Sequence, residues 1–180
     1  MSELSSLFVK LKIKKENLDR FFAAPLTTPA VDKDWTSWWD SREMYSKAPL
    51  EKIPTGFQPT NGAVFQSLLD DKQTMSEVKQ EAGMYYFVSV FFSENYYEIL
   101  PMLAILKSIA GYMEEGDEGV AFIYDFFWGG QGVLAHMEIT AGKAVLKETK
   151  HTSEINKALL TEANERIQHV LDNVPEDYND

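Results

Sequence analysis

The chain has 180 residues, of which 44% are hydrophobic and 13% aromatic, and it carries a formal net charge of −11 without any cysteine. This composition is too apolar for a disordered chain, and no apolar run approaches the ~18 residues of a membrane span. The lack of cysteine excludes disulfides, thiolate metal sites and cysteine nucleophiles. Because the first ten residues lack the basic and apolar segments of an export signal, we expect a cytoplasmic protein with no membrane partner.

The negative charge is concentrated in the last two thirds of the chain. Residues 1–60 carry nine basic and eight acidic side chains, whereas residues 61–180 carry eight and twenty. Such a surface repels nucleic-acid phosphates and attracts basic partners over a long range. We therefore expect no nucleic-acid partner, and ordinary solubility is the alternative reason for the charge.

The chain is expected to open with a strand and a short helix. Apolar residues alternate with mostly basic ones over residues 7–14, which predicts a strand with one buried and one solvated face. Its lysines would protect an exposed sheet edge. Apolar residues at helical spacing over 15–23 then predict a helix, which Pro25 ends.

Residues 24–62 are rich in proline and are predicted to form a long inserted loop that carries one short helix capped by Asp34. The side chains that share one face of this helix, or follow it, are Trp35, Trp38, Trp39, Arg42 and Tyr45. Trp, Tyr and Arg dominate interface hot spots, so this group is a candidate partner-binding surface. Packing of the same rings onto the sheet is the alternative.

The middle of the chain should alternate helices and strands. The expected elements are a helix over 74–82, a strand over 85–92 and a buried helix over 99–113. The helix over 74–82 is predicted from a capping-box pair, Thr74 and Glu77. Pro101 is expected in the first turn of the helix over 99–113. Residues 63–69 are too short and mixed to assign.

Three strands are expected next, over 120–128, 133–140 and 144–147. The first is apolar on both faces, which places it inside the sheet, and the second should have one solvated face. The glycine-rich residues 129–132 between them predict a hairpin turn, since they lack the lysine and the following helix of a phosphate-binding loop.

Ser153 is expected to cap a long C-terminal helix that Pro175 ends, with residues 175–180 as a frayed tail. Together these elements predict a single α+β domain over residues 1–180. We expect a mostly antiparallel mixed sheet, made of a strand–helix start and a C-terminal β-meander, with helices packed on it.

No linear motif names a reaction. His136 lies two residues from Glu138, and with Tyr124 and Asp125 it could form a small catalytic site on the meander; an exposed or structural histidine is the alternative. The histidines are far apart and have no metal-ligand spacing, so we expect neither a metal nor a cofactor.

The residues Glu114, Glu115, Asp117 and Glu118 form an acidic turn before the first strand of the meander. This turn is a candidate docking patch for a basic partner, and plain solvation of the charges is the alternative. No calcium-loop spacing follows it.

In its whole-chain profile, and in the segment Asp34–Arg42 (DWTSWWDSR), the chain resembles the immunity proteins that bacteria encode beside polymorphic or contact-dependent toxins. The resemblance implies a cytosolic module that binds a cognate protein toxin and blocks it by steric and electrostatic occlusion. The toxin would be basic, as a nuclease is, and would meet the carboxylates of this chain. A small enzyme around His136 and Glu138, and a structural or oligomeric adaptor, remain the alternatives.

Overall fold

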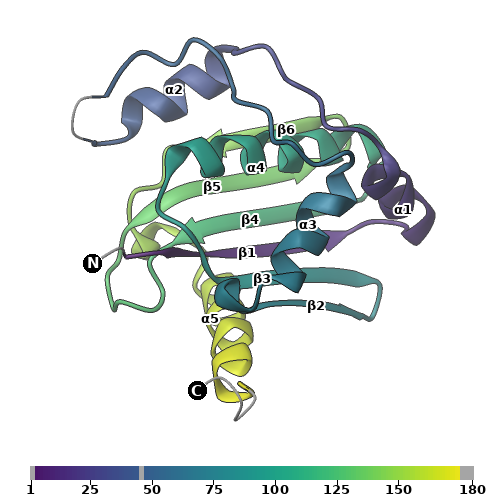
Figure 1. Cartoon of the computed structure of the whole chain (residues 1–180), viewed down its shortest axis with the longest axis vertical. Coiled ribbons are helices and arrows are strands. Elements are labelled where there is room, and N and C mark those ends of the chain that lie inside the picture. Colours follow the sequence, from purple (N-terminus) through teal and green to yellow (C-terminus); the bar gives the residue numbers. More distant parts are fainter. Residues whose placement is uncertain (1–2, 45–46, 175–180) are drawn as a thin grey trace.

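The structure is a computed structural model of the chain that describes residues 3–44 and 47–174, so the tail predicted at 175–180 lies outside it. Within these residues six strands form one antiparallel sheet, with helices on both faces (Figure 1). The strands are β1 (Ser5–Lys12), β2 (Ser76–Glu81), β3 (Met84–Ser93), β4 (Glu118–Tyr124), β5 (Val133–Thr140) and β6 (Lys143–Lys147). The helices are α1 (Lys15–Ala23), α2 (Lys33–Ser41), α3 (Asn61–Asp70), α4 (Tyr96–Ser108) and α5 (Lys157–Asp172). The predicted α+β fold is confirmed.

The order of the strands is β2-β3-β1-β4-β5-β6. The interior position predicted for β4 is confirmed, but the edge position predicted for β1 is wrong, because β3 and β4 pair with its two sides. Its alternating basic residues instead reach toward a helix: Lys10 forms an ion pair with Glu162 of α5 at 2.9 Å. The polar strand β2 is the one that lies at this edge of the sheet.

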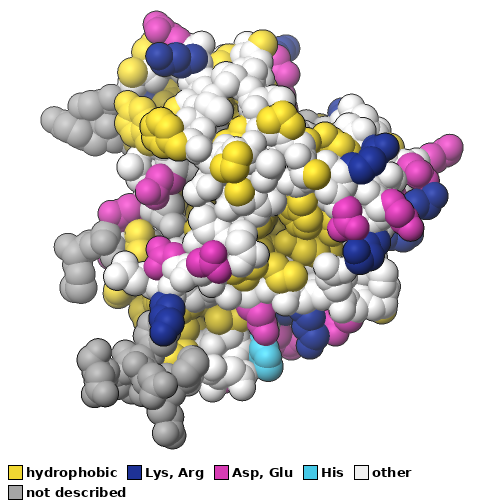
Figure 2. Space-filling view, turned by 45° about the vertical axis from the view of Figure 1, so that its right-hand side comes forward, with side chains coloured by type: hydrophobic (Ala, Val, Ile, Leu, Met, Phe, Trp, Pro, Cys, Tyr) yellow, Lys and Arg dark blue, Asp and Glu magenta, His cyan; other side chains and the backbone are white. Residues whose placement is uncertain are grey.

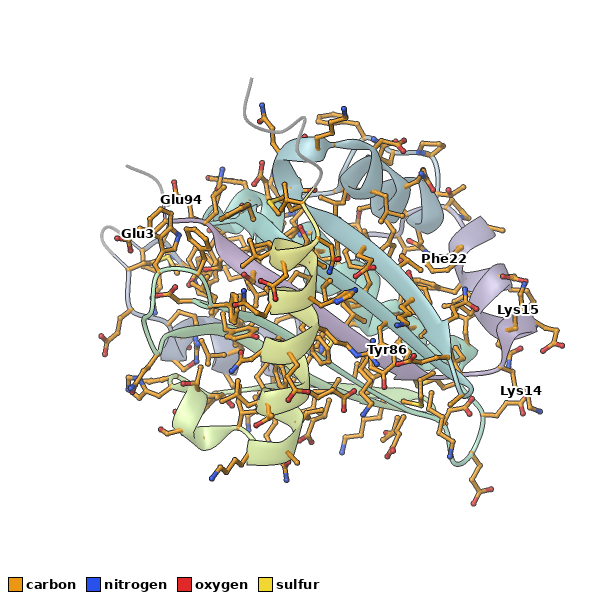
Figure 3. All side chains as sticks on the ribbon, turned by 90° about the horizontal axis from the view of Figure 1, so that it is seen from below. Glu3, Lys14, Lys15, Phe22, Tyr86 and Glu94 are labelled. Carbon is orange, nitrogen blue, oxygen red and sulfur yellow. The ribbon has the colours of Figure 1, made fainter. Side chains whose placement is uncertain are left out.

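Helices α1 to α4 cover one face of the sheet, and α5 covers the other (Figures 1 and 3). On the first face the alternate residues of β1, from Leu7 to Ile13, enter a large core with the four helices. On the second face Phe8 stacks on Phe122 at 5.9 Å, beneath the buried residues of α5. Both faces of β1 are therefore buried up to Val9, which the alternating sequence did not predict, while Lys10 is partly exposed and Lys12 is exposed.

Residues 76–81 form strand β2 and not the helix that Thr74 and Glu77 predicted. The reason lies in the connection to β3, where Ala82 and Gly83 have φ of +50° and +75°. Two successive left-handed residues make the two-residue turn that matches the twist of a β-hairpin. Pairing with β3 along the whole of β2 then outweighs the weak local preference for helix.

Helix α4 begins at Tyr96, with Asn95 as its cap, so Pro101 lies inside the helix and the first-turn prediction is wrong. Proline cannot donate to the carbonyl four residues earlier, which belongs to Tyr97. Tyr97 is 77% exposed, so water can satisfy that carbonyl. The unassigned residues 63–69 belong to α3.

Two predicted caps are also wrong by a few residues. Asp32 rather than Asp34 caps α2, and Asn156 rather than Ser153 caps α5. Asp34 instead accepts a hydrogen bond from the amide of Leu146 at 3.0 Å and pairs with Lys107, which ties α2 to β6 and α4. The helix predicted around the tryptophans is itself confirmed.

Gly62 marks a close approach of α3 to α1. A Cβ atom at this position would lie 2.9 Å from the carbonyl oxygen of Phe22 and 3.0 Å from its Cβ. We expect Gly62→Ala to lower the free energy of unfolding by about 1–2 kcal/mol, because the clash with backbone exceeds the gain of up to ~1 kcal/mol in helix propensity. Urea denaturation followed by circular dichroism measures this change.

Gly111 supplies the matched control, since a Cβ there meets nothing within 4 Å. Gly111→Ala should leave the stability unchanged or slightly raised. A Gly62→Ala protein as stable as the Gly111→Ala protein would contradict the close approach of the two helices.

Candidate functional site

The tryptophans of α2 are core residues and not an exposed contact surface. The exposed fractions of Trp35, Trp38 and Trp39 are 1%, 0% and 8%, and the indole Nε1 of Trp38 donates to the carbonyl of Leu134 at 3.2 Å. A side chain without exposed surface cannot contact a partner in this conformation. The predicted partner-binding role of the three rings is therefore corrected to packing. Tyr45, the fifth residue of that prediction, lies outside the described residues.

Arg42 follows α2 and is also buried, with 5% of its surface exposed. Its Nη1 donates to the carbonyls of Val133 and Leu134 at 2.7 and 3.3 Å, and its Nε and Nη2 donate to the Ser41 hydroxyl at 3.1 and 3.0 Å. The register of β4 against β5 shifts at Leu134, so that residue bulges out of the ladder and its carbonyl can accept from α2. Burial lowers the pKa of Arg42, yet a guanidinium stays charged at neutral pH.

The acidic turn is exposed, but part of its charge is compensated. Glu114 pairs with Lys14 at 2.5 Å, and this hydrogen bond holds the pKa of Glu114 below its ordinary value. Asp117 accepts from the Glu114 amide at 2.8 Å. Glu115 and Glu118 have no ion pair with any residue that the structure describes. Figure 2 shows acidic and basic side chains interspersed around a hydrophobic centre, so no single negative field covers the face in that view.

The two halves of the predicted site do not come together. Strand β4 begins at Glu118, in the acidic turn, and ends at Tyr124, which pairs with Val133 beside Arg42. Seven residues of strand span about 20 Å. The acidic turn and the α2 residues therefore lie at opposite ends of the sheet.

A cleft of about 470 Å³ lies at the α2 end of the sheet, and we call it the sheet-end cleft. Three of its carboxylates come from neighbouring strands: Glu3 precedes β1, Glu94 follows β3 and Asp125 follows β4. Figure 3 shows Glu3 and Glu94 together at one end of the sheet and Lys14 with Lys15 at the other. The amide of Glu3 donates to Glu94 at 3.0 Å, which fixes the start of the chain beside this carboxylate.

The basic residues of the same cleft come from other elements. Arg42 follows α2, and Lys150 and His151 lie in the segment between β6 and α5. Lys150 lies 4.0 Å from the exposed Glu43, too far and too solvated to be a strong pair. The cleft thus presents three carboxylates from the strand ends, whereas the flanking segments contribute the cations Arg42 and Lys150 and a fourth carboxylate, Glu43.

The loop 125–132, which contributes to the sheet-end cleft, also carries two exposed aromatic residues. Phe127 and Trp128 are 45% and 41% exposed, their rings lie 5.0 Å apart, and Phe127 lies edge-on to Phe91 at 4.9 Å. We call these three residues the aromatic tip. The Trp128 amide donates to Asp125 at 3.2 Å, which holds the loop against the strand end.

The aromatic tip was not predicted because the expected strand continued to residue 128, whereas β4 ends at Tyr124. The apolar pattern continues past the end of the strand, so periodicity does not show the boundary. Asp125 and the glycines from Gly129 onward were the available signals, since both are typical of a loop.

His136 is buried and not on a solvated face. It is 6% exposed, its Nδ1 lies 2.8 Å from the Thr149 hydroxyl, and its ring lies edge-on to Phe122. Burial lowers the pKa of His136 to about 4, so the imidazole is neutral at pH 7 and is a weak base.

The other residues of the predicted catalytic group do not converge on His136. Glu138 is exposed and pairs with Lys147 at 3.2 Å, while the hydroxyl of the buried Tyr124 donates to Asn164 at 2.7 Å. Asp125 belongs to the sheet-end cleft. The histidine therefore has a structural environment, with its polar atom bonded to Thr149.

In residues 3–44 and 47–174 no group of three or more His, Asp or Glu side chains could hold a metal ion, and no helix is long and apolar enough to cross a membrane. Comparison of the chain with protein-family models, with curated proteins and with solved structures finds no match. The geometry and charge of the sheet end are therefore the basis for assigning a function.

Proposed function

We propose that this protein binds a basic protein in the cytoplasm and blocks it, as an immunity protein neutralises a cognate bacterial toxin. The observation that carries the proposal is the aromatic tip. Its Phe127 and Trp128 lie in the same loop as Asp125 of the sheet-end cleft, and two more carboxylates of the cleft lie at the same end of the sheet. Half-exposed aromatic rings supply contact area, and surrounding carboxylates select a basic partner.

The aromatic tip is suited to binding because its rings are already held in place. Phe127 packs edge-on between Phe91 and Trp128, so ordering these side chains on binding costs little conformational entropy. The amide bond to Asp125 also restrains the backbone of the loop. A rigid aromatic anchor with a charged rim is the usual anatomy of an interface centre.

The net charge of −11 would act at longer range. Glu115 and Glu118 lie at the far end of the sheet, where they would contribute to the attraction of a basic protein without touching it. Attraction between a strongly acidic and a basic surface raises the association rate and falls with ionic strength. Occlusion of a basic active site by the sheet end would then be the mechanism of inhibition.

The test uses the purified protein and the product of the gene next to its own, with binding measured by surface plasmon resonance. We expect a complex whose association rate falls as salt rises, and protection of cells that express the neighbouring product. Phe127→Ala and Trp128→Ala should each weaken binding about 10- to 30-fold, because each removes aromatic contact area worth about 1–2 kcal/mol.

Phe57→Ala is the matched control, since Phe57 is fully exposed and lies in a different loop. This variant should bind as the unchanged protein does. Absence of both a complex and protection would overturn the proposal. A stable homodimer that Trp128→Ala dissociates would assign the aromatic tip to self-association and would also contradict it.

A further inference from the structure

Arg42 is a buried cation without a carboxylate in direct contact among the described residues, and the attraction of Glu148 and Glu154 from a longer distance is outweighed by the effect of burial on its pKa. Among residues 3–44 and 47–174 no carboxylate oxygen forms an ion pair with its guanidinium within 4.0 Å. Its partners are two carbonyls and one hydroxyl, all of them neutral. Because an uncompensated buried charge is costly, proteins seldom keep one without a counter-charge.

The hydrogen bonds to the carbonyls of Val133 and Leu134 explain why a donor follows α2 at position 42. A neutral donor could make the same bonds, so they do not require a permanent charge. Trp38 already donates to Leu134, one of the two carbonyls concerned, through a neutral indole. Arg42 also lines the sheet-end cleft, which has the volume of a small-ligand site. Four of its five N–H groups are used by the described partners, which leaves one Nη2 hydrogen for a further acceptor.

The rest of the sheet-end cleft restricts the charge of a ligand. Arg42 and Lys150 lie in the flanking segments together with His151 and one carboxylate, the solvated Glu43. The other three carboxylates, Glu3, Glu94 and Asp125, lie at the strand ends. A polyanion would be repelled by the four carboxylates of the cleft, and a polycation would meet the buried guanidinium. A ligand with one anionic and one cationic end satisfies both sides. Tyr96 and Leu134 also line the cleft.

We infer that the sheet-end cleft binds a small zwitterion of the amino-acid or dipeptide class, with its carboxylate on Arg42 and its ammonium group toward Glu94 and Asp125. A carboxylate on a guanidinium is a charge-assisted pair, which is strong where solvent is largely excluded. The ligand would supply the counter-charge that Arg42 lacks. This site shares Asp125 and the neighbouring carboxylates with the rim of the aromatic tip, but the inference does not depend on the proposed function.

The probe is the dipeptide alanyl-leucine, and binding is measured by isothermal titration calorimetry. We expect the unmodified dipeptide to bind, and both N-acetyl-alanyl-leucine and alanyl-leucinamide to bind at least about tenfold more weakly, because each lacks one of the two charges. No binding of the dipeptide at millimolar concentration would overturn the inference. Equal binding of either capped form would overturn the zwitterion assignment.

Arg42→Gln should weaken dipeptide binding at least about tenfold, as should Glu94→Gln. Glu94 is exposed, and glutamine retains an oxygen that can accept from the Glu3 amide, so this variant tests the site even if Arg42→Gln fails to fold. Arg20→Gln is the control, because Arg20 lies over the ring of Tyr112, away from the cleft. This variant should bind the dipeptide as the unchanged protein does. Unchanged binding by a folded Arg42→Gln or Glu94→Gln protein would contradict the inference.

Discussion

Replacing Trp38 by alanine should lower the free energy of unfolding by about 3–5 kcal/mol, the loss typical of removing a fully buried tryptophan. The ring has no exposed surface, lies 6.4 and 6.0 Å from the rings of Trp35 and Trp39, and donates to the carbonyl of Leu134. Alanine would leave a cavity between α2 and the sheet and would remove that hydrogen bond. Urea denaturation monitored by circular dichroism measures the change.

Phe57→Ala is the control for this measurement, because an aromatic residue that is fully exposed contributes little to the core. Its stability should stay within about 0.5 kcal/mol of the unchanged protein. A loss of less than about 1 kcal/mol for Trp38→Ala would mean that α2 does not pack on the sheet as the structure describes.

The stability of the protein should fall by up to about 3 kcal/mol through His136 alone as the pH falls from 7 to 4. Burial lowers the pKa of folded His136 to about 4 from its ordinary value of 6.5, against the smaller opposing effect of Glu138. The unfolded state therefore binds a proton first. The stabilisation is complete above pH 6.5 and is lost progressively between pH 6.5 and 4.

Nuclear magnetic resonance titration of the imidazole of His136 measures its folded pKa directly. Urea denaturation at several pH values, compared with His136→Gln, separates this histidine from the carboxylates that titrate nearby. The variant should show a shallower loss of stability over the same range, because glutamine does not ionise. A pKa for folded His136 near its ordinary value would contradict the burial of the ring.

The elements that sequence patterns predicted correctly are those with a strong local period. Strand β5 has the predicted bounds, and the predicted α1 is confirmed, since a period of two or of 3.6 is visible within one element. Strand β2 was missed because it is a polar edge strand with a single β-branched residue, Val78. Its conformation is set by the turn at Ala82–Gly83 and by pairing with β3. Neither the turn nor the pairing produces a periodic pattern in the sequence of β2.

The candidate site was only partly predictable for a related reason. Helical spacing identified the aromatic face of α2, but the same spacing describes a core face and an interface face, and only the burial of Trp38 decides between them. The carboxylates Glu3, Glu94 and Asp125 are far apart in the chain and meet because β1 lies between β3 and β4. The order of the strands cannot be read from local patterns, so this cluster could not be predicted.

The interior position of β1 in the sheet also has a consequence for folding during synthesis. Strand β1 is synthesised before both of its partners, β3 and β4, and the last residue of β4 is Tyr124. At 5–20 residues per second, roughly 5 to 20 seconds of synthesis separate β1 from its second partner. Through that interval the apolar residues of β1, Leu7 among them, have no completed sheet to enter and stay exposed until β4 emerges.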